Sequence, residues 1–476
     1  MRPFRWVSRA AGTCRGRWHA GHGAEPCDFA ARIAGVRVTY AVLTGLALAA
    51  SVTLRATVDV LVPDRTISTT LQPDGEAWFE LEATAGDAVR VRIEQRGIDV
   101  SIAVSAPDGR RLLVTNTSDR AYGTEVAAFV ADASGTYRLT ARPVDRTHTG
   151  GRLDLRMTAR HPARHEDRAF IDAMRTFGDA IALKATAAVD LSAGRQEALI
   201  DTLDAARRQF DAVGDTWGEA RALLEVSIAS AVAQRWDDLE QPMRRALALW
   251  DSLDDPYSLA LALNLEGMRL AAAGRPSEAA TVTRRALALA RTGGDDATAS
   301  LAANNLGIMT DTMGNAEEAY DLFQEALTRR QRAGRGIAEE LVLTNLARLS
   351  ANLGDIASAT TTYERALELA TTASQRAAAR VITNNLANLR RNAGDVAGAL
   401  ELHRTSLELS RALRLAAGEA QALNGIGTDL FQLGRYAEAE SVQRESLTLR
   451  RSARDVTGIA STGGCASNSL RSHWHR

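Results

Sequence analysis

The sequence predicts a mainly α-helical protein, a solenoid of helical hairpins with a period of 40 residues, preceded by a small antiparallel β-sandwich and an N-terminal apolar segment. An uncharged run covers residues 38–54, and short runs of alternating polarity fill residues 55–160. Further on, glycines recur at a fixed interval, which is typical of stacked helical units. These glycines are Gly274, Gly314, Gly354, Gly394 and Gly434.

The composition excludes several functional classes. The 476 residues carry a formal net charge of −1 and 5% aromatic side chains, so we predict no nucleic-acid partner. Cys14, Cys27 and Cys465 are far apart and form no CxxC pair, which predicts neither a disulfide framework nor a zinc site. Phosphate-binding glycine loops and nucleophile-elbow motifs are absent from the sequence. We therefore predict no catalytic residues, no metal, no cofactor and no enzymatic activity.

Residues 1–54 are predicted to be a leader. Arg37 and Arg55 bound the uncharged run 38–54, and further arginines precede it. A positive flank before an apolar core indicates a signal peptide or a single membrane anchor. Either would place the rest of the chain outside the cytoplasm, on the periplasmic or extracellular side; a buried helix of the next domain is the remaining alternative. The abundance of arginine and alanine indicates a bacterial source.

Residues 55–160 are predicted to form the β-sandwich. Val89, Val91 and Ile93 show the alternation that gives a strand one apolar face. Turn sequences such as Pro-Asp-Gly at 107–109 separate the runs, and short strands at this spacing are typical of a sandwich. The predicted strands are residues 77–82, 88–95, 100–106, 111–116, 125–130, 135–142 and 152–160.

Residues 165–455 are predicted to form seven helical hairpins, with Gly194 extending the glycine column upstream. Counted from each glycine, the position seven residues before it is small, and leucine stands thirteen residues after it. The positions five and twelve residues after it are mostly alanine. Small side chains let helix backbones approach closely. Because glycine readily adopts a left-handed backbone, we expect the column to mark the turn inside each hairpin, with a polar loop between hairpins.

These columns resemble those of the tetratricopeptide repeat (TPR) family, whose repeat has about 34 residues. The additional residues would lengthen either the helices or the loop. HEAT repeats also have about 40 residues, but the spacing of the small positions favours TPR. The resemblance implies a superhelix whose concave groove is lined by the first helix of each hairpin, and a protein or peptide partner in that groove.

The resemblance also implies candidate binding residues. The groove-facing position ten residues before the glycine is polar in five consecutive repeats, and further polar residues lie near it on the same helices. Asparagine within a helix is about 0.5 kcal/mol less favourable than alanine, so its recurrence needs an explanation. A ladder of amides could bind the backbone of an extended peptide, or the amides could join neighbouring helices. The candidates are Asn264, Asn304, Thr344, Asn384 and Asn424, followed by Arg348, Asn388 and Arg391.

His403 stands where neighbouring repeats have Tyr363 or Gln443, so we predict a packing or surface role for it rather than catalysis. The order of leader, β-sandwich and repeats resembles the N-terminal part of bacterial CHAT-domain proteins, which carry a caspase-like module after their repeats. That module is absent from this sequence, and the repeat pattern is lost over residues 456–476, as after a truncation or frameshift. The leading prediction is a non-enzymatic scaffold. The alternative is the regulatory or substrate-docking part of a CHAT-type cysteine protease.

Overall fold

The computed structural model describes residues 59–117, 120–144, 150–187, 193–233, 235–334, 339–372 and 375–452. The predicted apolar segment 38–54 and the predicted tail 456–476 lie outside these ranges, so both stay predictions. Among the described residues, no helix combines the length and the apolar character needed to cross a membrane.

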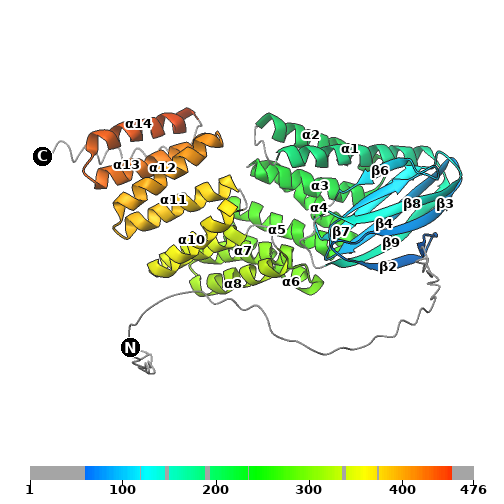
Figure 1. The fold of residues 1–476 in the computed structure, drawn as a ribbon, viewed down its shortest axis with the longest axis horizontal. Coiled ribbons are helices and arrows are strands. Elements are labelled where there is room, and N and C mark those ends of the chain that lie inside the picture. Colours follow the sequence, from blue (N-terminus) through cyan, green and yellow to red (C-terminus); the bar gives the residue numbers. More distant parts are fainter. Residues whose placement is uncertain are drawn as a thin grey trace, which may run out of the picture. The chain divides into compact units, whose positions relative to one another are not determined.

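A two-sheet β region comes first in the described chain (Figure 1). One sheet has the strand order β1-β3-β8-β5-β6 and the other has the order β2-β9-β4-β7. Phe79 and Tyr137 from the first sheet share one buried core with Val91 and Leu155 from the second. The strands are β1 (Asp59–Val60), β2 (Thr66–Leu71), β3 (Ala77–Ala83), β4 (Asp87–Arg96), β5 (Val100–Ser105), β6 (Arg111–Thr115), β7 (Tyr122–Val130), β8 (Gly135–Pro143) and β9 (Gly151–Pro162).

The predicted strands correspond in position to β3–β9, whereas β1 and β2 were not predicted from the sequence. Strand β2 buries only Ile67 and Leu71, and its other residues are serine and threonine, so its apolar alternation is weak. Strand β1 pairs parallel with β3, with Asp59 opposite Phe79. The sandwich is therefore not wholly antiparallel, because this short strand runs beside β3 in the same direction.

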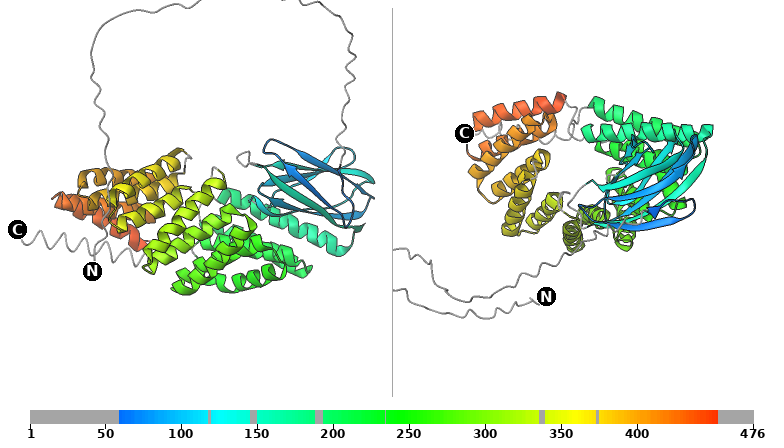
Figure 2. Two further views of the ribbon diagram at one scale, coloured as in Figure 1. Left: turned by 90° about the horizontal axis from the view of Figure 1, so that it is seen from below. Right: turned by 45° about the vertical axis from the view of Figure 1, so that its right-hand side comes forward.

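A TPR-like solenoid of helices follows, and its hairpins succeed one another in sequence order (Figures 1 and 2). From α11 onward each helix has 17 residues and each linker has three. The residues beyond the 34 of a usual repeat therefore lengthen the helices rather than a loop. The helices are α1 (His165–Ala187), α2 (Ala193–Ala212), α3 (Thr216–Val232), α4 (Glu240–Ser252), α5 (Pro256–Ala272), α6 (Pro276–Gly293), α7 (Asp296–Thr312), α8 (Ala316–Arg332), α9 (Glu339–Asn352), α10 (Ile356–Thr372), α11 (Arg376–Asn392), α12 (Val396–Ala412), α13 (Ala416–Gln432) and α14 (Tyr436–Ser452).

The glycine column marks left-handed turns inside the hairpins, as predicted. At Gly394, φ is 93°, and its N–H donates to the carbonyl of Arg391 while the next N–H donates to the carbonyl of Arg390. These two bonds form a Schellman motif. The turns from α6 to α7 and from α12 to α13, which lie between hairpins, use the same conformation, at Gly294 with φ 73° and at Arg414 with φ 54°. Gly194 lies inside α2 and does not belong to the column of turns, which corrects the prediction.

Small residues permit the closest helix contacts. A Cβ atom at Gly307 would lie 2.7 Å from the ring of Phe323 on the next helix. The alanine column five residues after the glycines, including Ala319 and Ala359, is 0% exposed. The leucine column is less uniform, because Leu327 and Leu367 are only partly buried. The small positions therefore determine how closely the helices pack.

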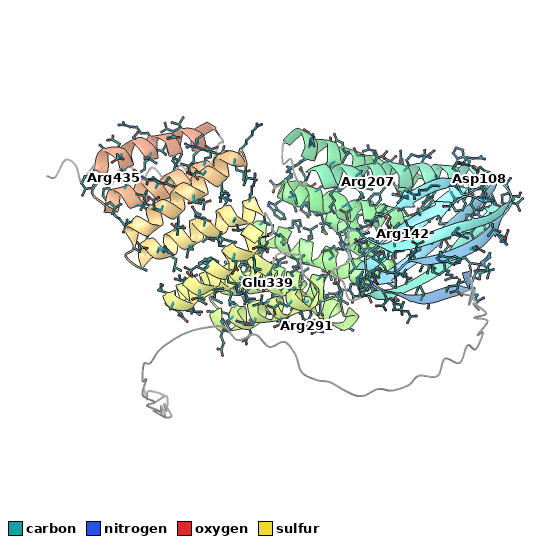
Figure 3. All side chains as sticks on the ribbon, viewed as in Figure 1. Asp108, Arg142, Arg207, Arg291, Glu339 and Arg435 are labelled. Carbon is teal, nitrogen blue, oxygen red and sulfur yellow. The ribbon has the colours of Figure 1, made fainter. Side chains whose placement is uncertain are left out.

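Exposed ion pairs join the second helices of neighbouring hairpins. Arg284 pairs with Glu318 at 2.9 Å, and Arg291, labelled in Figure 3, donates to Glu325 at 2.8 Å. Exposed pairs of this kind contribute about 0–1 kcal/mol each, so they add little to the stability of the array.

Aromatic contacts join the β region to the first helices within one compact unit. The ring centroids of Tyr122 and Tyr257 lie 5.2 Å apart, and the Tyr122 hydroxyl donates to the carbonyl of Gly294 at 3.0 Å. The Arg90 guanidinium lies 3.4 Å from the ring centroid of Phe170, close enough for a cation–π interaction.

Candidate functional site

An amide ladder joins the first helices of successive hairpins. The Asn305 side-chain NH₂ donates to Oδ1 of Asn264 at 3.1 Å, and that of Asn345 donates to Oδ1 of Asn304 at 2.9 Å. Asn264 and Asn304 are each 2% exposed. For these two residues the structure shows the bonding between neighbouring helices that was one of the two alternatives, and their oxygens are occupied.

Two further candidates also lie in structural contacts. The Thr344 hydroxyl donates to the carbonyl of Glu340 one turn earlier, at 2.6 Å. Arg348 on α9 pairs with Asp311 on α7 at 2.8 Å, and its side chain is 39% exposed. Arg348 is therefore within reach of a partner, whereas the Thr344 side chain is largely committed to its own helix.

The donor position of the ladder has no side chain at Gly425. Asn305, Asn345 and Asn385 precede this position at intervals of 40 residues, but Gly425 has no side chain to donate to Asn384. A Cβ atom at residue 425 would lie 2.4 Å from Cδ2 and 2.5 Å from Nε2 of His403. The missing side chain therefore makes room for the His403 ring beside α13.

A polar pocket of about 260 Å³ lies at Gly425. It brings together four of the predicted residues, Asn384, Asn388, Arg391 and Asn424, and it excludes the other four. Helices α11 and α13 contribute most of its lining. The remaining lining residues are His403, Gln421, Gly425, Thr428 and Arg450.

His403, which lines the pocket, forms a buried pair with Asp429 behind it. His403 Nδ1 lies 2.5 Å from Oδ2 of Asp429, and both side chains are 0% exposed. The other carboxylate oxygen of Asp429 accepts from Arg391 Nη1 at 3.1 Å. Arg391 also donates to Oδ1 of Asn388. These four side chains thus hold one another in fixed orientations.

Neighbouring hairpins have apolar residues at the positions of this pair. Phe323 packs with Leu349, and Tyr363 lies in the same core cluster as Leu389, each pair having the same separation in sequence as His403 and Asp429. Burial raises the pKa of Tyr363 to about 12, so its hydroxyl stays neutral. Because a buried carboxylate is costly to desolvate, the exchange of an apolar pair for a histidine and an aspartate distinguishes this hairpin from its neighbours.

Buried polar atoms of the pocket that have no hydrogen-bond partner include Nε2 of His403 and Oδ1 of Asn424. An unsatisfied buried polar atom destabilises a fold by about 1–3 kcal/mol, so its presence in a native structure calls for an explanation. The pocket can therefore supply hydrogen-bonding groups to a bound molecule.

The sequence predicted a packing or surface role for His403 and did not identify its partner. The packing role predicted for His403 agrees with its burial, whereas Asp429 was not singled out. A signal was present, because Asp429 stands in a column where neighbouring repeats have Leu349 and Leu389. Comparison of equivalent positions among the repeats would have identified Asp429 as the acidic residue in an otherwise apolar column.

A larger hollow of about 1100 Å³ lies between β6, β7 and α1. Apolar side chains such as those of Leu113, Val126 and Ile171 line much of it, and it contains none of the predicted binding residues. Across the described ranges, no group of three or more His, Cys, Asp or Glu side chains is placed to hold a metal ion. The polar pocket is therefore the candidate site.

Comparison with known proteins identifies the repeats. Residues 298–372 and 378–452 match the tetratricopeptide repeat family, which corresponds to the hairpins from α7 to α14. The chain thus contains TPR repeats, a scaffold suited to protein binding and generally non-enzymatic. No curated protein matches the chain.

Several solved structures resemble this chain at low identity, each with a TM-score below 0.5. The apo form of RapI is 12% identical, with a TM-score of 0.48, covering 61% of this chain and 100% of its own. A Rap protein complexed with Competence and Sporulation Factor is 16% identical, with a TM-score of 0.45, covering 61% and 76%. BtubC from P. vanneervenii is 20% identical, with a TM-score of 0.36, covering 53% and 94%. The likeness is one of fold alone.

Proposed function

We propose that this chain is a non-enzymatic scaffold that binds a protein or peptide along the first helices of its hairpins. TPR hairpins support the proposal because their stacking creates an extended binding surface. The observation that carries it is the loss of the ladder's donor side chain at Gly425, where an open polar pocket lies beside Asn384. The side chains of Asn388 and Gln421 line this pocket, where a partner can reach them.

We expect the double variant Asn388→Ala and Gln421→Ala to weaken partner binding about tenfold or more, because it removes hydrogen-bonding groups worth about 1 kcal/mol each. Neither residue is fully buried, so the melting temperature should change little. Partner proteins would be captured on the tagged full chain and identified. Each purified partner would then be titrated into the wild type and the double variant, with the affinity measured by calorimetry. The control is Glu401→Ala on the exposed face of α12, where the side chain is 71% exposed. Equal affinities for the double variant and the wild type would contradict the proposal.

We further propose that the protein acts outside the cytoplasm, exported or anchored through residues 38–54. The support is the uncharged run with its arginine flank. Residues 1–60 fused to an alkaline phosphatase without its own signal should give activity in bacterial cells, because that reporter folds only after export. Charges placed inside the run by Leu46→Arg and Leu48→Arg should abolish the activity. Equal activity of the two fusions would reject the proposal.

The alternative function is a docking part of a CHAT-type protease. It rests on the order of the predicted segments alone, and the pocket described above favours neither the protease nor an independent scaffold. Genomic sequence beyond the codon for residue 455 distinguishes them: a shifted frame encoding a histidine–cysteine module would favour the protease.

A further inference from the structure

We infer that the pocket beside His403 binds the carboxamide side chain of a glutamine or asparagine in the partner. This inference rests on the proposed peptide-binding function and specifies the chemistry of one subsite. It follows from an inventory of which groups in the pocket donate hydrogen bonds and which accept them. The side chains that carry the argument are His403, Asn424, Asn388, Gln421 and Arg391.

The acceptors lie on one side. The 2.5 Å contact between Nδ1 of His403 and Oδ2 of Asp429 places the ring proton on Nδ1, since the carboxylate can only accept. Asp429 is already paired with the Arg391 guanidinium, which balances the charge of the carboxylate without a second proton on the His403 ring. Nε2 is then an acceptor, buried and without a partner, as is Oδ1 of Asn424. A bound group must therefore bring donors to these two atoms.

Two arginines determine how the side-chain amides of Asn388 and Gln421 are oriented, and therefore where these residues present donors. Arginine can only donate, so the amide atom that faces it must be oxygen. Arg391 binds Oδ1 of Asn388, and Arg380 binds Oε1 of Gln421 at 3.3 Å. Both amides consequently turn their NH₂ groups away from these arginines, and each residue lines the pocket. A bound group must therefore also bring an acceptor.

Only some polar side chains satisfy both requirements. A carboxylate has acceptors only and would place oxygen against Nε2 of His403 and Oδ1 of Asn424. An ammonium has donors only and would face the positive charges of Arg391 and Arg450. A carboxamide offers an NH₂ group and a carbonyl oxygen together. The volume of about 260 Å³ is below the usual range of pockets for drug-sized ligands, roughly 300–1,000 Å³, and is suited to a single side chain.

Free amino-acid derivatives test the inference without an identified partner. N-acetyl-glutamine methylamide, and its glutamate and lysine counterparts, would be titrated into the full chain carrying ¹⁵N-histidine, with the imidazole nitrogen shifts of His403 followed by NMR. We expect the glutamine derivative to shift these signals saturably, and the other two to bind about tenfold more weakly because each leaves groups unpaired. Glutamate binding as tightly as glutamine, or no response to any derivative, would overturn the inference.

Two variants control the titration. Gly425→Ala places a methyl group against the His403 ring and should abolish the response, whereas Gly178→Ala, where an added Cβ meets nothing within 4 Å, should leave it unchanged. If Gly425→Ala fails to fold, the double variant His403→Tyr with Asp429→Leu removes the acceptor while restoring the apolar pair of the preceding hairpin. In that variant binding is followed by calorimetry, and retained glutamine binding would contradict the inference. If the chain binds its partner but none of the three derivatives, the carboxamide subsite is refuted and the proposed peptide-binding function is retained.

Discussion

Replacing Asp429 with leucine alone is expected to destabilise the hairpins around α13 by about 3 kcal/mol or more. The change leaves the buried His403 ring and Arg391 without the carboxylate that accepts from both. Removing one member of a buried charged pair costs about 3–5 kcal/mol, because the remaining group stays desolvated and unpaired. The free energy of unfolding would be measured by urea titration of the full chain.

Adding His403→Tyr to Asp429→Leu is expected to recover the part of that loss that comes from the unpaired His403 ring, while Arg391 stays without its carboxylate. The double variant reproduces Tyr363 and Leu389, which share a core cluster at the same separation in sequence. Exchanging a buried charged pair for apolar residues of similar size is often neutral or stabilising, by about 1–4 kcal/mol. A double variant no more stable than Asp429→Leu would show that the neighbouring hairpins do not share one packing scheme.

The stability of helices α12, α13 and α14 must be measured separately from that of the full chain. Hairpins in a repeat array contact mainly their neighbours, so a terminal segment can unfold before the rest. Hydrogen exchange of the amides in α12, α13 and α14 would therefore accompany the urea titration. Faster exchange confined to these helices in Asp429→Leu, and its reversal in the double variant, is the expected pattern.

The elements that the sequence predicted well depend on local constraints. A left-handed residue at Gly354 or Gly394 is a requirement of the turn itself, and the period of 40 residues repeats it along the chain. Alternation of apolar residues likewise identified β3–β9. The failure at Gly194 has the same origin, because spacing alone cannot distinguish a glycine in a turn from one inside a helix.

The candidate site was predicted only in part because its geometry depends on contacts between hairpins. Asn304 and Asn384 occupy equivalent positions, but Asn304 is bonded to Asn345, whereas Asn384 faces Gly425 one repeat later. The role of each asparagine is thus decided by a residue about 41 positions further along the chain. His403 and Asp429 lie on different helices, and their pairing became evident only when the helices were placed side by side.

A second large effect is expected at Glu225, whose replacement by alanine should destabilise the unit by about 4 kcal/mol. Glu225 on α3 is 1% exposed and accepts from Arg221 Nη1 at 3.0 Å and Lys184 Nζ at 2.9 Å. Arg120, which precedes β7, approaches it at 3.4 Å. One carboxylate therefore balances cations from α1, α3 and the β region.

Removing this carboxylate would leave like charges close together at a buried junction. Arg221 has a side chain only 6% exposed and also donates to the carbonyl of Thr117 at 2.8 Å, so it cannot turn into solvent without losing a contact with the β region. We therefore expect Glu225→Ala to loosen the β region from α1 and α3, which faster hydrogen exchange and proteolysis at that junction would detect. Glu278→Ala, at an exposed pair with Arg275, is the matched control and should have little effect. Because the Glu225 cluster is buried, added salt should screen it weakly. A wild-type exchange pattern at the junction in Glu225→Ala would mean that apolar and aromatic contacts, such as Tyr122 with Tyr257, hold the β region on the helices unaided.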